Sequence, residues 1–178
     1  MQEIELKILK INLEEVNAKL LALGAKKEAT VLVIDKTFDF HTHLLAKKNH
    51  ALRLRQMGDK FFITYKGGVQ KGKIANIIEE IETSVGDVKI FEQILKKLGL
   101  QCYKHREKKR TSYILPNIRC ELDEYPGIPP YLEIEGPQND IQNIVEELGF
   151  DLKNTTRASI SKVLKKYNIK SDDLKFKE

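Results

Sequence analysis

The tripeptide Glu-Ile-Glu occurs three times in the chain, at residues 3–5, 80–82 and 133–135. The two carboxylates of each copy are two residues apart, so a β-strand would place them on the same face. Each copy is followed by an amphipathic helix pattern that ends at a Leu-Gly pair. We therefore expect three carboxylate pairs at equivalent places in the fold. Carboxylate oxygens are hard ligands that suit Mg²⁺ or Mn²⁺.

Basic side chains alternate in the same way along other predicted strands. Arg53 and Arg55 share one face of a strand, and Lys66 shares a face with Thr64 on the next. Residues 104, 106, 108 and 110 are all lysine or arginine. Arginine binds phosphate bidentately and lysine binds it as a point charge. The basic faces therefore fit a ligand with several phosphate groups, and carboxylate pairs beside such a ligand imply divalent cations between them.

Hydrophobic periodicity predicts the elements that carry these residues. Amphipathic helices are predicted from Asn12 to Gly24, from Asp87 to Gly99, over 141–149, and from Thr155 or Thr156 to Tyr167. Strand patterns cover about 2–10, 28–40, 50–57, 60–66, 74–85, 101–114, 117–124 and 131–136. Hairpin turns link most neighbouring strands, which favours an antiparallel sheet, and about eight strands suffice to close a barrel.

The charged strand faces are either a solvated surface or the lining of an interior, depending on the side of the sheet to which they point. Each face taken alone also fits a solvated exterior. Four amphipathic helices, however, need an apolar surface to cover, and the opposite strand faces supply one. The charges would then point into the barrel, where a lone buried ion costs several kcal/mol and a pair roughly breaks even. A charged interior is therefore interpreted as a water-filled tunnel that binds a polyphosphate.

Composition is typical of a globular protein of one domain. The 178 residues are 41% hydrophobic and 32% charged, with a net charge of +5 and a pI of about 9.0. We expect a single domain over residues 1–170 and a charged tail over 171–178. No membrane span or export signal is evident, which predicts a cytoplasmic protein. Cys102 and Cys120 match no zinc spacing. The composition is also compatible with a homodimer.

The charged motifs, taken in their order along the chain, resemble those of a known family. Glu3-Ile4-Glu5-Leu6-Lys7 is similar to the N-terminal ExExK signature of the CYTH superfamily, the triphosphate tunnel metalloenzymes. The paired arginines, the lysine of Thr64–Gly67, the 80–82 pair, the 108–110 strand and the acidic block over 123–136 follow in the family's order. The resemblance implies an α+β fold, in which an eight-stranded antiparallel closed β-barrel forms the triphosphate tunnel and amphipathic helices pack on its outside.

The resemblance also implies the roles of individual residues. The triphosphate would be bound by Lys7, Arg53, Arg55, Lys66, Lys108 and Arg110. Mg²⁺ or Mn²⁺ would be bound by Glu3, Glu5, Glu133 and Glu135, with Glu80, Glu82 and Asp123 at a second metal position. The expected catalytic residues are Asp123, Glu82 and Lys66, with Asp123 or Glu82 as the base that orients the attacking water.

The predicted activity is metal-dependent hydrolysis of inorganic triphosphate or of a simple organic triphosphate. The alternative is a class IV adenylyl cyclase, which would use the same cradle to convert ATP into cyclic AMP and pyrophosphate. A cyclase also needs a nucleoside pocket, and the chain has no clear aromatic sandwich and no tryptophan. Where some thiamine triphosphatases carry D-x-Y-x-D, this chain has Asp35-Lys36-Thr37-Phe38-Asp39, which disfavours thiamine triphosphate because the phenol is absent.

Two further classes remain as alternatives. A nucleic-acid-binding module would fit the basic pI and the run over 104–110. No aromatic platform interleaves that run, and carboxylate pairs repel a phosphate backbone, so no nucleic-acid partner is expected. A triphosphate receptor without turnover would use the same clamp, but the full set of acidic residues favours an enzyme.

Overall fold

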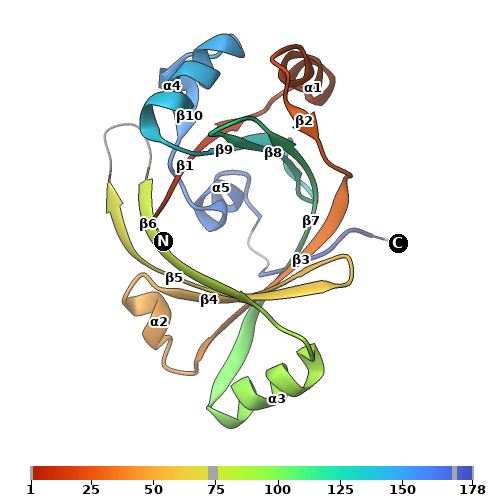
Figure 1. The fold of residues 1–178 in the computed structure, drawn as a ribbon. Coiled ribbons are helices and arrows are strands. Elements are labelled where there is room, and N and C mark those ends of the chain that lie inside the picture. Colours follow the sequence, from red (N-terminus) through yellow and green to blue (C-terminus); the bar gives the residue numbers. More distant parts are fainter. Residues whose placement is uncertain (1, 72–75, 170–171, 178) are drawn as a thin grey trace.

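The structure, a computed structural model, has an α+β fold, and the residues that it describes form one sheet of eleven strands and five α-helices (Figure 1). It describes residues 2–71, 76–169 and 172–177, with side chains except at 2, 3, 68–71 and 76–78. The strands are β1 Gln2–Leu9, β2 Lys26–Lys27, β3 Val31–Phe40, β4 Ala51–Met57, β5 Lys60–Lys71, β6 Asn76–Ser84, β7 Leu100–Ile114, β8 Arg119–Glu124, β9 Tyr131–Glu135, β10 Thr155–Thr156 and β11 Asp173–Leu174. The helices are α1 Leu13–Ala22, α2 Leu44–Lys47, α3 Val88–Lys97, α4 Gln138–Glu147, α5 Ile160–Lys166 and the 3₁₀ turn η1 Leu152–Asn154.

The sheet has the strand order β10-β1-β6-β5-β4-β3-β7-β8-β9, and β2 and β11 also pair with β7. These pairings are antiparallel except for β11 with β7. β1 pairs with β6 on one side and also with β9 on the other. Figure 1 shows the strands curving around a common centre. The antiparallel α+β class is confirmed. The described residues form eleven strands rather than the expected eight, because three two-residue strands add to the eight long ones. Closure of the sheet into a barrel stays a prediction.

The apolar faces of the strands point towards the helices. Leu6 and Ile8 of β1 are buried in one core cluster with Leu20 of α1 and with Ile141 and Leu148 of α4. Since side chains alternate along a strand, the charged residues of β1 that lie between these leucine and isoleucine positions face the opposite side. The expectation that helices cover the apolar outer face is confirmed for α1 and α4.

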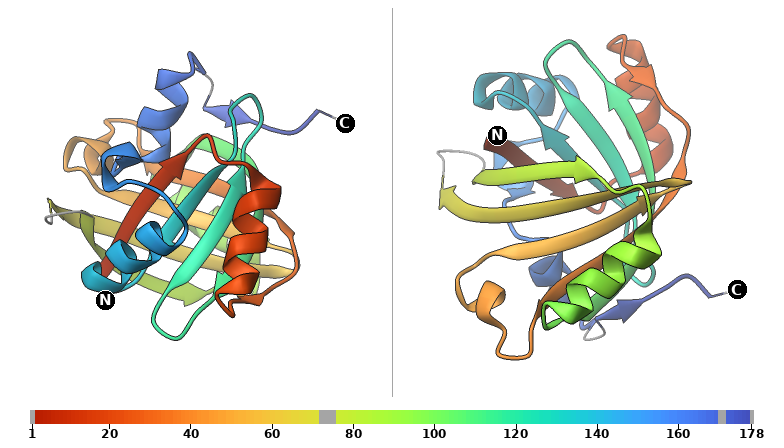
Figure 2. Two further views of the ribbon diagram at one scale, coloured as in Figure 1. Left: turned by 90° about the horizontal axis from the view of Figure 1, so that it is seen from above. Right: turned by 60° about the horizontal axis from the view of Figure 1, so that its bottom comes forward.

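Helix α5 does not pack on the outer face of the sheet. Val163 and Leu164 pack against Tyr125 and Tyr131 rather than against the outer strand faces. Figures 1 and 2 together place α5 across one end of the curved sheet. The physical reason is that the apolar face of α5 meets two inward-facing tyrosines. The expectation that every helix packs on the outside is therefore wrong for α5.

Two predicted boundaries differ from the structure. Thr155 and Thr156 pair with β1 as β10 and do not begin a helix, which starts at Ile160 instead. Strand β5 continues to Lys71, with a register shift after Gly67. Part of the predicted strand over 74–85 lies outside the described residues. The predicted helix cap at Asn12 is confirmed, because its side chain accepts from the backbone N–H of Glu15.

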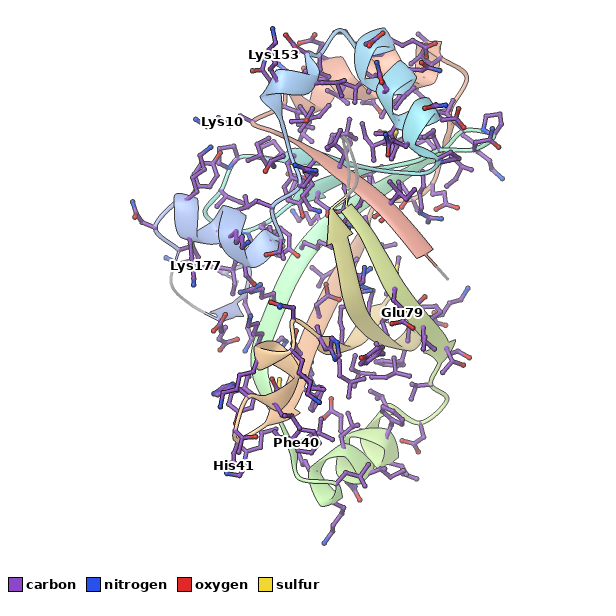
Figure 3. The ribbon with its side chains drawn as sticks, turned by 90° about the vertical axis from the view of Figure 1, so that its left-hand side faces the viewer. Lys10, Phe40, His41, Glu79, Lys153 and Lys177 are labelled. Carbon is purple, nitrogen blue, oxygen red and sulfur yellow. The ribbon has the colours of Figure 1, made fainter. Side chains whose placement is uncertain are left out.

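Figure 3 shows the molecule from the side. Lys10 and Lys153 lie at the end that carries α1 and α4, and Phe40 and His41 lie near α2 and α3 at the other end. Among the described residues, no helix is long and apolar enough to cross a membrane. The tail predicted from 171 contains β11, and the division of the chain near residue 170 stays a prediction.

Candidate active site

A cavity of about 300 Å³ lies inside the curve of the sheet. Five of the residues predicted to bind triphosphate line it, namely Lys7, Arg53, Arg55, Lys66 and Lys108. They come from β1, β4, β5 and β7, and the first turn of α5 closes part of the wall. The cavity volume is at the lower end of the range for small-molecule sites. The structure thus gathers cations from distant parts of the chain around a space for a small anion.

Asp35 holds Arg55 in the cavity wall. The two residues lie directly opposite each other on β3 and β4, and Arg55 donates from Nε and Nη2 to the Asp35 carboxylate at 2.7 and 2.9 Å. Burial alone would lower the pKa of Arg55, but Asp35 outweighs it and the pKa lies above its usual value. Burial and the neighbouring Arg55 lower the pKa of Arg53. The two guanidinium groups therefore form a fixed positive wall.

Asp123 anchors the β7 cations from behind. It is fully buried, and it accepts from Lys108 Nζ at 2.7 Å, from Arg110 Nε and Nη2 at 2.7 and 2.6 Å, and from Tyr131 Oη at 3.0 Å. Burial would raise the pKa of Asp123, but Arg110 and Lys108 hold it below its usual value. Asp123 and Arg110 are not among the described residues that line the cavity. The roles of Asp123 as base and metal ligand stay predictions.

The pKa of Lys108, in the cavity wall, is lowered towards neutral pH. Burial and the neighbouring Arg110 lower the pKa of Lys108 to about 8, although Asp123 favours the charged form. Its ammonium group shares the Asp123 carboxylate with Arg110. The charge of this wall therefore depends on pH in the mildly alkaline range.

Lys7 lies between two carboxylates. Its Nζ is 3.1 Å from Glu5 Oε1 and 2.8 Å from Glu133 Oε2, and Arg110 donates to the other oxygen of Glu133. Strands β1 and β9 pair antiparallel and place Lys7 opposite Glu133 and Glu5 opposite Glu135. Burial would raise the pKa of Glu133, but Lys7 and Arg110 hold it well below its usual value. Glu133 is therefore ionised in the absence of any ligand.

The same pairing brings three carboxylates together. Glu5, Glu133 and Glu135 can each offer one carboxylate oxygen within 4.8 Å of the others. Among the described residues, this is the only group of three such ligands. Three carboxylate oxygens beside a cavity lined by cations fit Mg²⁺ or Mn²⁺, which take oxygen ligands and keep several waters. The side chain of Glu3 lies outside the described residues.

Glu80 and Glu82 line a second, larger cavity of about 1030 Å³, together with Glu135 and the turn over 114–119. Arg53 Nη2 lies 3.6 Å from Glu80 and 3.8 Å from Glu82, and Lys66 Nζ lies 2.9 Å from Glu80. These ion pairs join the residues of the two cavities. The structure does not bring Glu80 and Glu82 into the three-carboxylate group, so a second metal at this place stays a prediction.

Asp35, Glu121 and Tyr131 belong to the site but were not among the predicted site residues. Lys104 and Arg106 were predicted to share the basic strand face, but no binding role was assigned to them. Glu121 pairs with Arg110 and with Arg119. Charged and apolar residues alternate from Arg119 to Asp123, so Glu121 shares a strand face with Asp123. Only the register of β7 with β8 brings Glu121 near Arg110. Thr37, which stands where D-x-Y-x-D has its tyrosine, lines the cavity.

The sequence profile of the CYTH domain matches residues 1–167. The chain therefore belongs to the CYTH domain family. A protein of Methanocaldococcus jannaschii that is provisionally named adenylate cyclase is 29% identical over 174 residues. The match covers 98% of this chain and 94% of that protein.

Solved structures share the fold. A protein of Pyrococcus horikoshii OT3 has a TM-score of 0.74 and 25% identity, with 88% of this chain and 96% of that chain covered. A second protein of that organism has a TM-score of 0.76 and 24% identity, with 92% and 98% covered. A Hippeastrum protein provisionally named adenylyl cyclase and described as having a dominant triphosphatase activity has a TM-score of 0.64 and 16% identity, with 93% and 95% covered.

Proposed function

We propose that the protein is a divalent-metal-dependent hydrolase of inorganic triphosphate or of a simple organic triphosphate. The observation that carries the proposal is the cavity in which Lys7, Arg53, Arg55, Lys66 and Lys108 meet beside three carboxylates. The sheet would surround the substrate as a tunnel, which the pairing of β1 with both β6 and β9 supports. A cavity of this charge has little use other than to bind a highly charged ligand, because buried ion pairs hardly stabilise a fold.

The residues of the chain would bind the phosphates and hold them in line. Arg55, fixed by Asp35, and Lys108, fixed by Asp123, form rigid donors, so little freedom is lost on binding. Glu5, Glu133 and Glu135 would hold Mg²⁺ or Mn²⁺. When bound, such an ion neutralises phosphate charge and lowers the pKa of a water ligand.

Binding would require an exchange of partners. Lys7 pairs with Glu5 and Glu133, and these carboxylates are needed for the metal. As phosphate oxygens take over Lys7, its two carboxylates would become available to the cation. The phosphate and the metal ion would thus replace the internal ion pairs of Lys7, and no buried charge would be left unpaired.

Glu82 is the better placed of the two predicted bases. Its side chain is 41% exposed, and Thr64 donates a hydrogen bond to it at 2.6 Å. Asp123 is fully buried, and both of its oxygens already accept from cations. We therefore propose that Glu82 orients the attacking water, whereas Asp123 positions Lys108 and Arg110.

A class IV adenylyl cyclase is the second candidate, since the relative from Methanocaldococcus jannaschii carries that name. The cyclase reaction needs the same phosphate clamp but brings the 3′-hydroxyl of ATP to the α-phosphorus. The Hippeastrum protein of the same fold has a dominant triphosphatase activity, which supports hydrolysis as the first candidate.

A side-by-side assay distinguishes these functions. Inorganic triphosphate, ATP and thiamine triphosphate would be incubated with Mg²⁺ and with Mn²⁺, and phosphate, pyrophosphate and cyclic AMP would be measured. We expect phosphate release, fastest from inorganic triphosphate and lost in EDTA. Cyclic AMP with equimolar pyrophosphate from ATP would instead establish the cyclase. No product from any substrate, despite tight triphosphate binding, would make the protein a receptor.

A further inference from the structure

The row of cations on β7 continues past the predicted triphosphate clamp. Lys104 and Arg106 lie on the same strand face as Lys108 and line the same cavity. From residue 104 to residue 108, the part of the row that lines the cavity, the strand rises by about 13 Å, at roughly 3.3 Å per residue. This row is longer than a chain of three phosphate groups. The end of the row near α5 is therefore available to another anionic group.

The side chains at this end form a defined set of donors. Ser161 in the first turn of α5 accepts from Arg106 Nη1 at 3.0 Å, and Lys104 Nζ lies 3.4 Å from the same hydroxyl. The Arg106 side chain is 9% exposed, and its buried Nε has no hydrogen-bond partner. A buried donor without an acceptor is costly, and an anion at this position would remove that cost.

The local charge is not balanced. The carboxylate that pairs with Arg106 is Asp172, at 2.8 Å, and it is 53% exposed. On the side of Lys104, burial, Arg106 and Lys165 all lower the pKa of the lysine, and Asp172 opposes them. Because Asp172 is half in solvent, an incoming anion could share Arg106 with it or replace it.

We propose that Lys104, Arg106 and Ser161 form a further anion subsite, which holds a phosphate group beyond the three in the clamp. The group would be the fourth phosphate of a linear inorganic polyphosphate or a separate orthophosphate ion, and both use the same oxyanion chemistry. This inference rests on the proposed function, because the clamp must first hold three phosphates. It extends the substrate class of the site from triphosphates to longer phosphate chains.

Isothermal titration calorimetry of the full chain in EDTA tests the subsite without turnover. Inorganic triphosphate, inorganic tetraphosphate and, with triphosphate-saturated protein, orthophosphate would be titrated. If the fourth phosphate reaches Arg106, tetraphosphate should bind about tenfold more tightly than triphosphate. Arg106→Gln should remove this difference, so that the variant loses much more affinity for tetraphosphate than for triphosphate. Lys104→Gln, which alters one weaker contact, should reduce the difference in part.

Asp172→Asn is the matched control, because Arg106 also anchors the C-terminal segment through Asp172. This variant loses the charged anchor but keeps the cation, so it should bind tetraphosphate as tightly as the wild type or more tightly. Saturable orthophosphate binding that Arg106→Gln abolishes would identify a separate ion as the occupant.

Three results would decide against the subsite or against its premise. If tetraphosphate binds no better than triphosphate and orthophosphate does not bind, the subsite is refuted while the clamp stands. If Arg106→Gln weakens both chains equally, or if Asp172→Asn behaves like Arg106→Gln, Arg106 has a structural role only. If the wild type binds no triphosphate with or without Mg²⁺, the proposed function itself fails.

Discussion

At the scale of single residues, the inner face of the sheet consists of carboxylates that are shared among several cations. Asp123 accepts hydrogen bonds from Lys108, Arg110 and Tyr131. Glu133 forms ion pairs with Lys7 and Arg110. Buried ion pairs of this kind contribute little net stability, yet the loss of one partner is costly. The network therefore keeps the unliganded cavity folded and leaves charges ready to change partners.

The proposed exchange of partners would make metal binding and triphosphate binding depend on each other. We expect Mg²⁺ to tighten triphosphate binding about tenfold or more, and triphosphate to tighten Mg²⁺ binding by the same factor, since such coupling is reciprocal. Calorimetric titrations of each ligand with and without the other would measure this. Glu5→Gln replaces one of the three proposed metal-binding carboxylates by an amide, so Mg²⁺ should no longer tighten triphosphate binding. If Mg²⁺ still tightens it by the wild-type factor, the assigned metal position is contradicted.

Replacement of Asp123 should mainly affect stability. Asp123→Asn leaves Lys108 and Arg110 without their shared carboxylate, and the loss of one partner of a buried ion pair costs about 3–5 kcal/mol. The free energy of unfolding from urea denaturation would show this. Asp59→Asn, in an exposed turn, should change it by less than about 0.5 kcal/mol. Equal effects of the two changes would contradict the network.

The lowered pKa of Lys108 predicts a pH dependence of binding. Below a pKa of about 8 the free protein carries the ammonium charge, and above it the charge is progressively lost. Phosphate binds the charged form, so triphosphate affinity should fall as the pH rises through 8. Lys108→Arg stays protonated and should lack this fall. Identical pH profiles of the two proteins, measured by calorimetry, would contradict the assignment.

At the scale of elements, the helices reveal which face of the sheet is apolar. Leu20 of α1 is fully buried against the outer strand faces, whereas the adjacent Leu21 is 46% exposed. Leu20→Ala should lower the free energy of unfolding by about 2–5 kcal/mol. Leu21→Ala should lower it by less than about 1 kcal/mol. Similar losses for both, measured by denaturant unfolding, would contradict the orientation of α1.

The sequence was sufficient to predict the long strands and their charged faces. Alternation of residue types assigns Arg53, Arg55 and Lys108 to one side, and the amphipathic helices decide that this side is the inner one. The ion-pair partners could not be predicted, because Asp35 meets Arg55 only through the register of β3 with β4. The last helix was misjudged at its start, since Thr155 and Thr156 gain hydrogen bonds by pairing with β1.

At the scale of the whole molecule, the fold places a polar, ionic space where most small domains have an apolar core. The apolar clusters lie between the outer strand faces and the helices, while Glu5, Lys7 and Arg55 face the cavity. Helix α5 closes one end of that space. This arrangement lets the protein keep charged side chains out of bulk water and still accessible to a small anion.

The most direct test of the account is Mg²⁺-dependent release of orthophosphate from inorganic triphosphate by three proteins. The wild type and Lys109→Gln, which removes an exposed cation from the outer side of β7, should turn over at similar rates. Arg55→Gln, which removes a fixed cation from the cavity wall, should lower kcat/KM by at least about a hundredfold with the fold intact by circular dichroism. Wild-type rates in Arg55→Gln, or a loss of activity in Lys109→Gln alone, would show that the inner face of the sheet is not the site.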